Sequence, residues 1–262
     1  MCHVGFIAEV VAVSASMKAV ILAAGSATRL RPLTEHTPKC LLEVAGRPIL
    51  RRLLDHLAAL GVDEVTIVLG YLGSKIRDAV AQWSPAIRIG FVDNAEYATT
   101  NNGYSTLLAV EAAGGHEFML LDADIVCERE VIARVLRHPI PDCLGVRPST
   151  TLGIEEMKIV LDPNGRVREC AKTVDPRLAI GESIGINRFS PHASTRFFTA
   201  LHDRVRVKGL VNEYNDSAVQ QMIEEHGYEL WPVDLGTLYC AEIDTPADLA
   251  EVDARVLGMT TC

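Results

Sequence analysis

Arg29 and Lys39 are cations that follow a turn of small residues, and this combination is suited to binding phosphate. The turn comes directly after the apolar run 19–23 and consists of Ala24, Gly25, Ser26 and Ala27. Because small side chains leave backbone N–H groups uncovered, such a turn after a strand can cradle an anion. The pattern predicts a phosphate-binding loop for a nucleotide. The alternative is an ordinary tight turn, which needs small residues for packing alone.

Two carboxylates are expected at the same place in the fold. Asp122 and Asp124 follow the apolar run 117–121, which predicts a buried strand. In open parallel sheets, ligands bind at the carboxyl ends of the strands. The small-residue turn and the two aspartates both end a strand, so we expect cations and carboxylates on one rim. The alternative is that the aspartates only end the strand and cap the next helix, and for Asp122 we expect a supporting role.

The elements that must position these residues alternate between strands and helices over residues 17–138. This alternation predicts right-handed βαβ units and a mainly parallel sheet. The expected fold class is α/β, a single Rossmann-like domain whose mixed, mainly parallel sheet is flanked by helices. The expected strands are 19–23, 41–44, 64–70, 87–92 and 117–121, and the expected helices are 49–60, 74–83, 105–113 and 131–136.

Residues 140–235 predict a small inserted substrate-binding lid on this core, with no composition break that would make it an independent domain. Its clearest feature is a hairpin in which strands 158–161 and 167–170 flank a turn at 162–165. Further strands are expected at 144–147, 180–186 and 229–233, and helices at 191–201, 217–226 and 247–257. We interpret residues 1–16 as an N-terminal extension and 17–262 as the domain. A secretory signal is the weaker alternative, because the segment lacks a basic start.

Composition excludes several classes of protein. The net charge of −9 argues against a nucleic-acid binder, which would show a basic face. The seven cysteines are scattered without Cys-x-x-Cys spacing, so they indicate neither a zinc site nor a redox dithiol, and they fit reduced thiols in the cytoplasm. No apolar run approaches the ~18 residues of a membrane helix. We expect a cytoplasmic protein that binds neither nucleic acid nor membrane.

Three motifs, taken in order, resemble the nucleotidyltransferases that join a phosphate ester to a nucleoside triphosphate. They are Leu22-Ala23-Ala24-Gly25-x-x-x-Arg29-x-x-Pro32-x-Thr34 with Pro38-Lys39, Asp122-Ala123-Asp124, and Glu242-Ile243-Asp244-Thr245-Pro246-x-Asp248-Leu249. The resemblance covers the chain from Met17 and implies a fold of the nucleotide-diphospho-sugar transferase type. It implies Arg29 and Lys39 as catalytic residues and Mg²⁺ held by Asp124 and Asp244, in line with the preference of Mg²⁺ for one or two carboxylates. For Asp244 the alternative is a helix cap before Pro246.

The stretch 100–105 indicates which subgroup of these nucleotidyltransferases the chain resembles. It is similar to cytidylyltransferases that act on small phosphorylated amino-alcohols or phosphonates, such as those specific for phosphocholine and 2-aminoethylphosphonate. Asn amides and a Ser hydroxyl can read a pyrimidine edge, whereas the alternative is helix capping by Asn102 or Ser105. The resemblance then implies nucleotide binding by Leu22, Ala23, Ala24, Gly25, Ser26, Ala27, Thr28, Asn101, Asn102, Ser105 and Asp122.

A second group of residues looks like the substrate half of the same subgroup. Its members are Tyr104, Lys172, Glu182 and Asp216. Lys172 is expected to meet the phosphate or phosphonate, and Glu182 and Asp216 to face a cationic amine, with a solvated surface as the alternative for both. Choline usually needs an aromatic cage, for which this region offers Phe189, Phe197, Phe198 and Tyr214. A primary amine bound by carboxylates is at least an equal alternative.

The sequence therefore predicts a Mg²⁺-dependent cytidylyltransferase that transfers CMP from CTP to a small phosphate or phosphonate and releases pyrophosphate. The alternatives are a sugar-1-phosphate nucleotidyltransferase that uses UTP, dTTP or GTP, and a non-catalytic nucleotide-binding regulatory protein. The second substrate, the pathway and the oligomeric state stay open, with a homodimer as one option. One position departs from the family pattern: Ala27 stands where Gly is usual, and we expect its methyl group to hold a phosphate slightly farther away.

Overall fold

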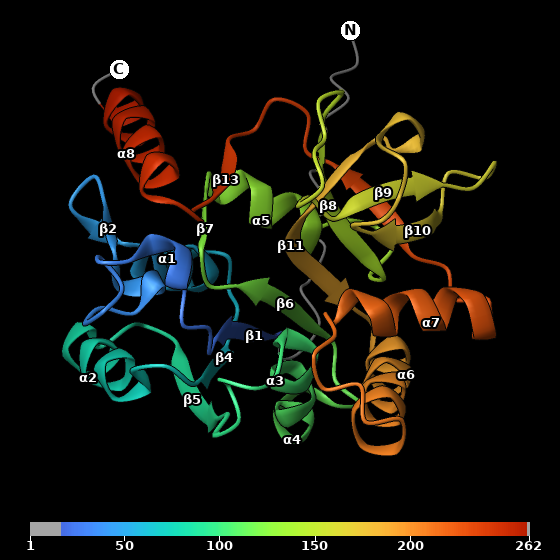
Figure 1. The fold of residues 1–262 in the computed structure, drawn as a ribbon, viewed down its shortest axis with the longest axis horizontal. Coiled ribbons are helices and arrows are strands. Elements are labelled where there is room, and N and C mark those ends of the chain that lie inside the picture. The colour runs from blue at the N-terminus through green and yellow to red at the C-terminus, as the bar shows by residue number, and fades with distance from the viewer. Residues whose placement is uncertain (1–16, 261–262) are drawn as a thin grey trace, which may run out of the picture.

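The computed structural model describes residues 17–260, so the expected extension 1–16 lies outside the described residues. Within them, a nine-stranded sheet has the order β10-β9-β11-β6-β1-β4-β5, with β8 paired to β11 and β12 paired to β8 (Figure 1). The strands of this sheet are β1 (Lys18–Ala23), β4 (Glu64–Leu69), β5 (Arg88–Asp93), β6 (Phe118–Asp122), β8 (Cys143–Pro148), β9 (Lys158–Leu161), β10 (Val167–Ala171), β11 (Gly181–Phe189) and β12 (Trp231–Asp234). Because β6, β1, β4 and β5 pair in parallel, the predicted α/β class with a mainly parallel core is confirmed.

Helices lie on both faces of the sheet (Figure 1). They are α1 (Ile49–Ala59), α2 (Gly73–Trp83), α3 (Asn102–Leu108), α4 (Val110–Ala113), α5 (Arg129–Leu136), α6 (Pro191–His202), α7 (Asp216–His226) and α8 (Pro246–Thr260). The expected helix 105–113 is divided in two at Ala109. The expected strand 41–44 shrinks to the two residues of β2 (Glu43–Val44), which pair with β3 (Arg47–Pro48).

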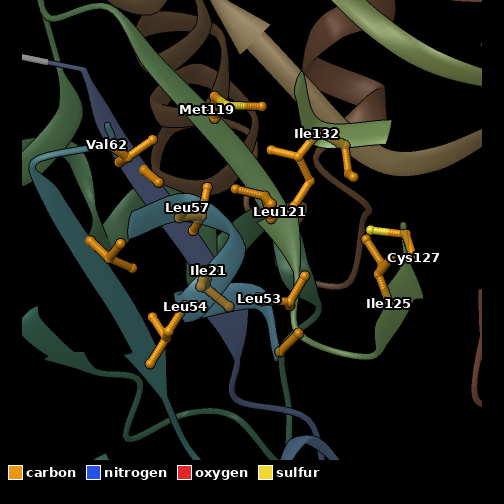
Figure 2. Packing of buried hydrophobic residues seen from close by; sticks show 14 of the residues in the cluster. Ile21, Leu53, Leu54, Leu57, Val62, Met119, Leu121, Ile125, Cys127 and Ile132 are labelled. Carbon is orange, nitrogen blue, oxygen red and sulfur yellow. The ribbon is translucent and has the colours of Figure 1, made fainter. Parts of the chain in front are cut away.

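Strand β1 is buried on both faces, which explains its short continuous apolar run. Ala19 and Ile21 belong to the hydrophobic cluster under α1 and α5, whereas Val20 and Leu22 belong to the cluster under α3 and α6. This alternation follows from the two-residue period of a strand. Figure 2 shows the first cluster, in which Ile21 of β1 packs against Leu53 and other side chains of α1. The strand that leads into the phosphate loop is therefore rigidly held.

Residues 140–235 continue the same sheet. Strand β11 pairs antiparallel with β6 in the register Ile186↔Leu121, and β9 and β10 form the predicted hairpin with Gly165 at φ 83°. Phe118 of β6 stacks on Phe189 of β11 with ring centroids 5.3 Å apart. The substrate half and the nucleotide half thus share one sheet and one hydrophobic cluster, which keeps the cavity between them in a defined shape.

Among the described residues, no helix has both the length and the apolar character needed to cross a membrane. Five described cysteines are free and buried: Cys40, Cys127, Cys143, Cys170 and Cys240.

Candidate active site

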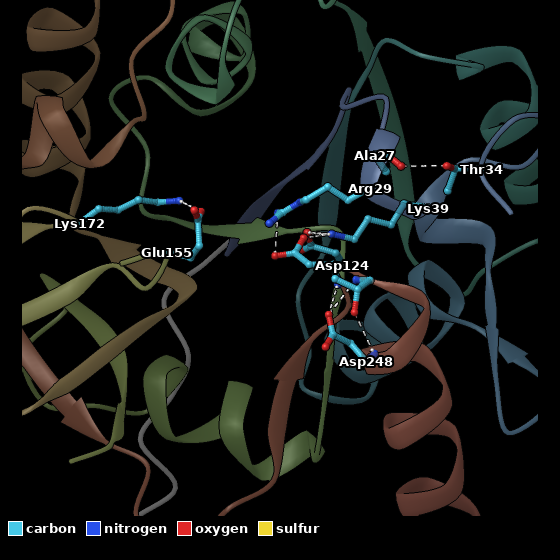
Figure 3. Close-up of polar contacts among 10 residues, drawn as sticks. Ala27, Arg29, Thr34, Lys39, Asp124, Glu155, Lys172 and Asp248 are labelled. Atoms are coloured by element: carbon cyan, nitrogen blue, oxygen red, sulfur yellow. Dashed lines mark hydrogen bonds and ion pairs between the residues drawn. The ribbon is translucent and has the colours of Figure 1, made fainter. Parts of the chain in front are cut away.

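Lys39 is at the centre of a network of salt bridges that joins three distant parts of the sequence. Its Nζ donates to Asp124 Oδ2 and to Asp244 Oδ1, both at 2.7 Å (Figure 3). Arg29 Nη2 lies 2.9 Å from the other oxygen of Asp244. The four residues that the sequence analysis singled out as catalytic or metal-binding are therefore brought together in space.

A two-stranded ribbon brings Asp124 and Asp244 together although they are far apart in the sequence. Strand β7 (Ile125–Cys127) begins directly after Asp124, and β13 (Cys240–Glu242), which pairs with it, ends two residues before Asp244. The amide of Ile243 donates to Asp124 O at 3.3 Å, which continues this pairing up to the two aspartates. The geometry of the carboxylate pair is consequently set by backbone hydrogen bonds rather than by a flexible loop.

Helix α8 fixes the backbone of Asp244 from the other side. The carboxylate of Asp248 accepts hydrogen bonds from the Asp244 and Thr245 amides at 3.0 and 2.7 Å, and Thr245 Oγ1 accepts from the Asp248 amide at 3.2 Å. This is a reciprocal capping box at the start of α8. Because Thr245 and not Asp244 caps the helix, the side chain of Asp244 is free to accept a hydrogen bond from Lys39. Figure 3 shows Asp248 close to the residues of this salt-bridge network.

Asp124 and Asp244 suit a hard cation. Asp124 Oδ1 is buried and has no hydrogen-bond partner, which marks it as an oxygen that needs a ligand. Among the described residues no group of three or more His, Cys, Asp or Glu side chains is arranged as a metal site. Mg²⁺ does not require one, because it is usually held by one or two carboxylates plus substrate phosphates. The residues present fit a Mg²⁺ ion that enters with a nucleotide.

The charges of this group influence one another. Burial alone would lower the pKa of Lys39, but the carboxylates of Asp124 and Asp244 outweigh it and raise that pKa. Burial likewise favours a higher pKa for Asp244, yet Lys39 and Arg29 bring it below the ordinary value. For Glu242, burial and then the charges of Asp124 and Asp244 raise the pKa to about 8. The Lys39 ammonium group and the Asp244 carboxylate are thus ionised at neutral pH.

In the small-residue loop, Ala27 adopts a backbone conformation that favours glycine. Ala27 is left-handed, with φ 46° and ψ 50°, and its carbonyl accepts from Thr34 Oγ1 at 2.8 Å (Figure 3). Gly25 is exposed, and no atom lies within 4 Å of the place a Cβ would take. The Cβ of Ala27 therefore adds local backbone strain to the loop, and its expected effect on the distance to a phosphate stays a prediction.

A cavity of about 670 Å³ runs from this loop to the substrate half of the chain. Most predicted site residues line it: Leu22, Ala23, Ala24, Gly25, Ala27, Arg29, Lys39, Asn101, Asn102, Ser105, Asp122, Asp124, Lys172, Glu182, Asp216 and Asp244. Ser26, Thr28 and Tyr104 are not among the lining residues. Tyr104 stands two helical positions from Asn102, so it points to another face of α3, where its ring packs against Arg206 at 4.9 Å. Tyr104 thus lies outside the cavity lining, and its expected contact with the substrate stays a prediction.

The polar residues at the start of α3 already have protein partners. Asn101 Oδ1 caps the helix by accepting from the Asn102 amide at 2.8 Å, and Asn102 Oδ1 accepts from the Asn215 amide at 2.8 Å. Ser105 Oγ accepts from Asn94 Nδ2 at 2.9 Å. Helix capping, the alternative weighed for this stretch, is thus present, although Asn101 is the capping residue. Base reading by these side chains stays a prediction.

The substrate end of the cavity contains two ion pairs that sequence reasoning missed. Lys172 Nζ lies 3.4 Å from Glu155 and 4.7 Å above the ring of Tyr214 (Figure 3 labels Lys172 and Glu155). Glu182, which was expected to face an amine, is paired with Arg147, its register partner in β8. Since that pairing joins distant strands, no local signal in the sequence could have indicated it.

Asp216 is a carboxylate that lines this end of the cavity, and no salt bridge is formed by it among the described residues. Its Oδ1 accepts a weak bond from Cys170 Sγ at 3.6 Å, and burial raises the pKa of its side chain. The phenylalanines considered for an aromatic cage lie elsewhere: Phe189, Phe197 and Phe198 are buried in the hydrophobic core, where Phe189 and Phe197 stack at 4.6 Å. Of the four aromatic residues considered, Tyr214 lines the cavity.

Comparison with known proteins fits this geometry. Residues 19–163, more than half of the 262-residue chain, match the family model described as the MobA-like NTP transferase domain. The chain belongs to this family. The match spans the phosphate loop, Lys39 and Asp124, while Asp244 lies beyond it.

Two relatives of this NTP transferase resemble it over about nine-tenths of its length. It is 31% identical over 248 residues to the CMP-5'-(3-aminopropyl)phosphonate synthase of Streptomyces rubellomurinus, and it spans 38% of that longer protein. It is 30% identical over 236 residues to the 2-aminoethylphosphonate cytidylyltransferase of Lancefieldella rimae, and it covers 91% of that chain. The CTP:phosphocholine cytidylyltransferase of Streptococcus pneumoniae has the same fold, with a TM-score of 0.73 at 23% identity, over 92% of this chain and all of that one.

Proposed function

We propose that this NTP transferase is a Mg²⁺-dependent cytidylyltransferase that transfers CMP from CTP to a small aminoalkylphosphonate or a similar phosphate ester. The observation that carries the proposal is the convergence of Lys39, Asp124 and Asp244, with 2.7 Å contacts, beside the phosphate loop and inside one cavity. Both relatives that match about nine-tenths of this chain are named for a cytidylyl reaction and for an aminoalkylphosphonate, which supports the choice of CTP and of the second substrate.

The reaction forms one P–O bond and breaks another. An oxygen of the phosphonate attacks the α-phosphorus of CTP, the bond from that phosphorus to the oxygen bridging the β-phosphate breaks, and pyrophosphate leaves with the electron pair. Because no covalent enzyme intermediate is needed, positioning and charge neutralisation carry most of the rate. Lys39 and Arg29 would donate charge-assisted hydrogen bonds to the phosphate oxygens. Bound Mg²⁺ supplies further positive charge, and Asp124 and Asp244 would hold it.

The substrate end favours a primary amine over choline. The face of Tyr214 is already covered by the ammonium group of Lys172, and three of the four candidate cage aromatics are in the core. A primary ammonium group can donate up to three hydrogen bonds to carboxylates, and Asp216 is a carboxylate without a cation in hydrogen-bond contact among the described residues. Lys172 and Asp216 line the same cavity, so Lys172 would bind the phosphonate of the small molecule whose amine Asp216 receives.

A pyrophosphate-release screen tests the proposal. CTP, UTP, dTTP and GTP are each combined with 2-aminoethylphosphonate, 3-aminopropylphosphonate, phosphocholine, inositol phosphate and hexose 1-phosphates. We expect release with CTP and an aminoalkylphosphonate. Release with UTP, dTTP or GTP and a hexose 1-phosphate would make the chain a sugar nucleotidyltransferase instead. No release in any combination would favour a non-catalytic nucleotide-binding protein.

A further inference from the structure

The segment 209–215, called here the return segment, lies across the first turn of α3. It leads from the π-helical turn Asp203–Val207 to α7. The first turn of α3 belongs to the stretch 100–105, which was expected to read the base. Three hydrogen bonds hold it there: Asn101 N–H to Val211 O at 2.9 Å, Gly103 N–H to Glu213 O at 3.2 Å, and Asn101 Nδ2 to Asn212 O at 3.3 Å. The N-terminal amides of α3 are thus satisfied by this segment and by the Asn101 cap.

A fourth hydrogen bond joins side chain to backbone at the end of the return segment. Asn102 Oδ1 accepts from the amide of Asn215 at 2.8 Å, and Asn215 is buried. Losing the acceptor would leave a buried N–H group unpaired, which is costly. The amide oxygen of Asn102 therefore holds the residue that directly precedes α7.

The two neighbours of Asn215 form the substrate end of the cavity. Tyr214 on one side lies under the Lys172 ammonium group at 4.7 Å, and Asp216 on the other presents its carboxylate beside Cys170. Both line the cavity. A shift of the Asn215 backbone would therefore move the groups proposed to receive the phosphonate and the amine.

The fit between α3 and the return segment is sterically tight. A Cβ added at Gly103 would lie 2.8 Å from Glu213 O and 3.4 Å from the carbonyl carbon of Tyr214. Arg204 Nε anchors the Glu213 carboxylate at 2.7 Å from the far side. The return segment therefore lies directly against the backbone of Gly103, one residue from the Asn102–Asn215 hydrogen bond.

We propose that Asn102 is a positioning residue for the second substrate, acting through Asn215 on Tyr214 and Asp216. This inference rests on the proposed function for the identity of the substrate. It gives Asn102 a role different from base reading, and the two roles make different predictions for the variants N102A and N102D. An Asp carboxylate can still accept from the Asn215 amide, but it cannot donate to a base as an amide can.

Hydrogen exchange of the free protein tests the contact without any substrate. In N102A we expect peptides covering residues 209–217 to lose protection, while N102D keeps protection near the wild-type level. Unchanged exchange in N102A would overturn the inference. Because this measurement needs no turnover, it is independent of whether CTP and an aminoalkylphosphonate are the substrates.

Steady-state kinetics test the consequence. In N102A we expect KM for the aminoalkylphosphonate to rise about fivefold to tenfold, as for loss of one hydrogen bond, while KM for CTP changes less than about twofold. N102D should restore the phosphonate KM. G103A displaces the same segment without altering the Asn102 amide, so it should reproduce the phosphonate defect even if N102A does not fold.

A base-reading role gives the opposite pattern. In that case N102A and N102D both raise KM for CTP or admit UTP, G103A does not, and the inference fails. Absence of turnover in the wild type overturns the proposed function, whereas turnover with an unchanged phosphonate KM in N102A and G103A overturns the positioning role.

Discussion

Lys39 Nζ lies 2.7 Å from Asp124 Oδ2, so the proposed catalytic lysine and a proposed metal ligand neutralise each other in the nucleotide-free protein. Asp244 takes part in the same contact, and the Lys39 side chain is only 14% exposed. Ion pairs shielded from water interact strongly, and breaking one by removing a partner leaves a charge uncompensated. In the proposed function, nucleotide binding would exchange these partners: Lys39 would contact phosphate, and Asp124 and Asp244 would hold Mg²⁺.

The first prediction concerns Lys39→Met. Turnover should fall about 10²- to 10³-fold, as for loss of one preorganised charge at a transition state. In the absence of nucleotide, binding of Mn²⁺ as a Mg²⁺ substitute should become about tenfold tighter, because the two carboxylates lose their competing cation. Electron paramagnetic resonance of free Mn²⁺ measures this binding directly.

Lys172→Met is the matched control for the metal measurement. Lys172 lines the same cavity but pairs with Glu155, so its loss should leave Mn²⁺ binding at the wild-type level. Mn²⁺ binding that is unchanged or weaker in Lys39→Met would contradict the partner exchange.

The second prediction concerns the metal. Chelation by EDTA should abolish turnover and added Mg²⁺ should restore it. Asp124→Asn should lower turnover about 10³-fold, because it removes a charged oxygen ligand and leaves Lys39 with one partner fewer. Asp93→Asn is the control: its side chain is 69% exposed and pairs with Arg77 at the surface, so its turnover should equal that of the wild type. Undiminished turnover in Asp124→Asn would remove Asp124 from the metal site.

Local patterns predicted much of this architecture. Three predicted features depend on interactions between residues close in sequence, and all three are present. They are the apolar strand β1, the hairpin turn at 162–165 and the alternation of strands and helices over 17–138. The neighbourhood of the small-residue loop and Asp124 follows a similar logic, since β1 and β6 are adjacent parallel strands whose carboxyl ends share an edge. The position of Asp244 was expected from the family resemblance alone, and the pairing of β13 with β7 brings it to Asp124.

What the sequence could not indicate depends on pairing between distant segments. Glu182 and Arg147 meet through the register of β11 and β8, and Asn102 meets Asn215 through a segment that returns from the far side of α6. The sequence around the phenylalanines of the substrate half does not indicate whether they form an aromatic cage for a ligand or pack in the hydrophobic core. Packing against Phe118 decided that question, because burying large aromatic rings together is strongly favourable.

The third prediction concerns the strained loop residue. Ala27 has φ 46°, a region that a Cβ makes unfavourable, so Ala27→Gly removes backbone strain from the folded protein. Glycine also has more conformational freedom in the unfolded chain, which offsets part of this gain. The free energy of unfolding should therefore stay the same or rise by up to about 1 kcal/mol. Chemical denaturation measures the change. Ala24→Gly provides the comparison, because Ala24 has no positive φ and the same substitution there should destabilise. A clear loss of stability in Ala27→Gly would mean that the loop is not strained.

The fourth prediction concerns Asp216 and pH. Burial raises the pKa of Asp216, so the folded protein disfavours the ionised carboxylate. The cost to stability is absent below the unfolded pKa of about 3.9 and grows as pH rises through the folded pKa. Asp216→Asn should therefore melt at a higher temperature than the wild type at pH 8, with a difference that narrows toward pH 4, and it should bind an aminoalkylphosphonate more weakly.

Asp203→Asn should behave in the opposite way. Hydrogen bonds from Lys208 and Gln221 lower the pKa of Asp203, so its contribution to stability is present above the unfolded pKa and is lost as pH falls through the folded value. This variant should melt lower than the wild type at pH 8, and the two should converge in acid. If Asp216→Asn also melted lower at pH 8, the carboxylate of Asp216 would be stabilised by contacts that its burial does not reveal.

The most direct measurement is a competition among nucleotides with the product identified. The protein is incubated with equal concentrations of CTP, UTP, dTTP and GTP, with 2-aminoethylphosphonate and Mg²⁺, and the products are followed by ³¹P nuclear magnetic resonance and mass spectrometry. We predict a CMP-linked phosphonate and one pyrophosphate for each molecule formed, with the other three nucleotides left intact. A product that carries another nucleotide, or consumption of CTP without a CMP-linked product, would contradict this prediction.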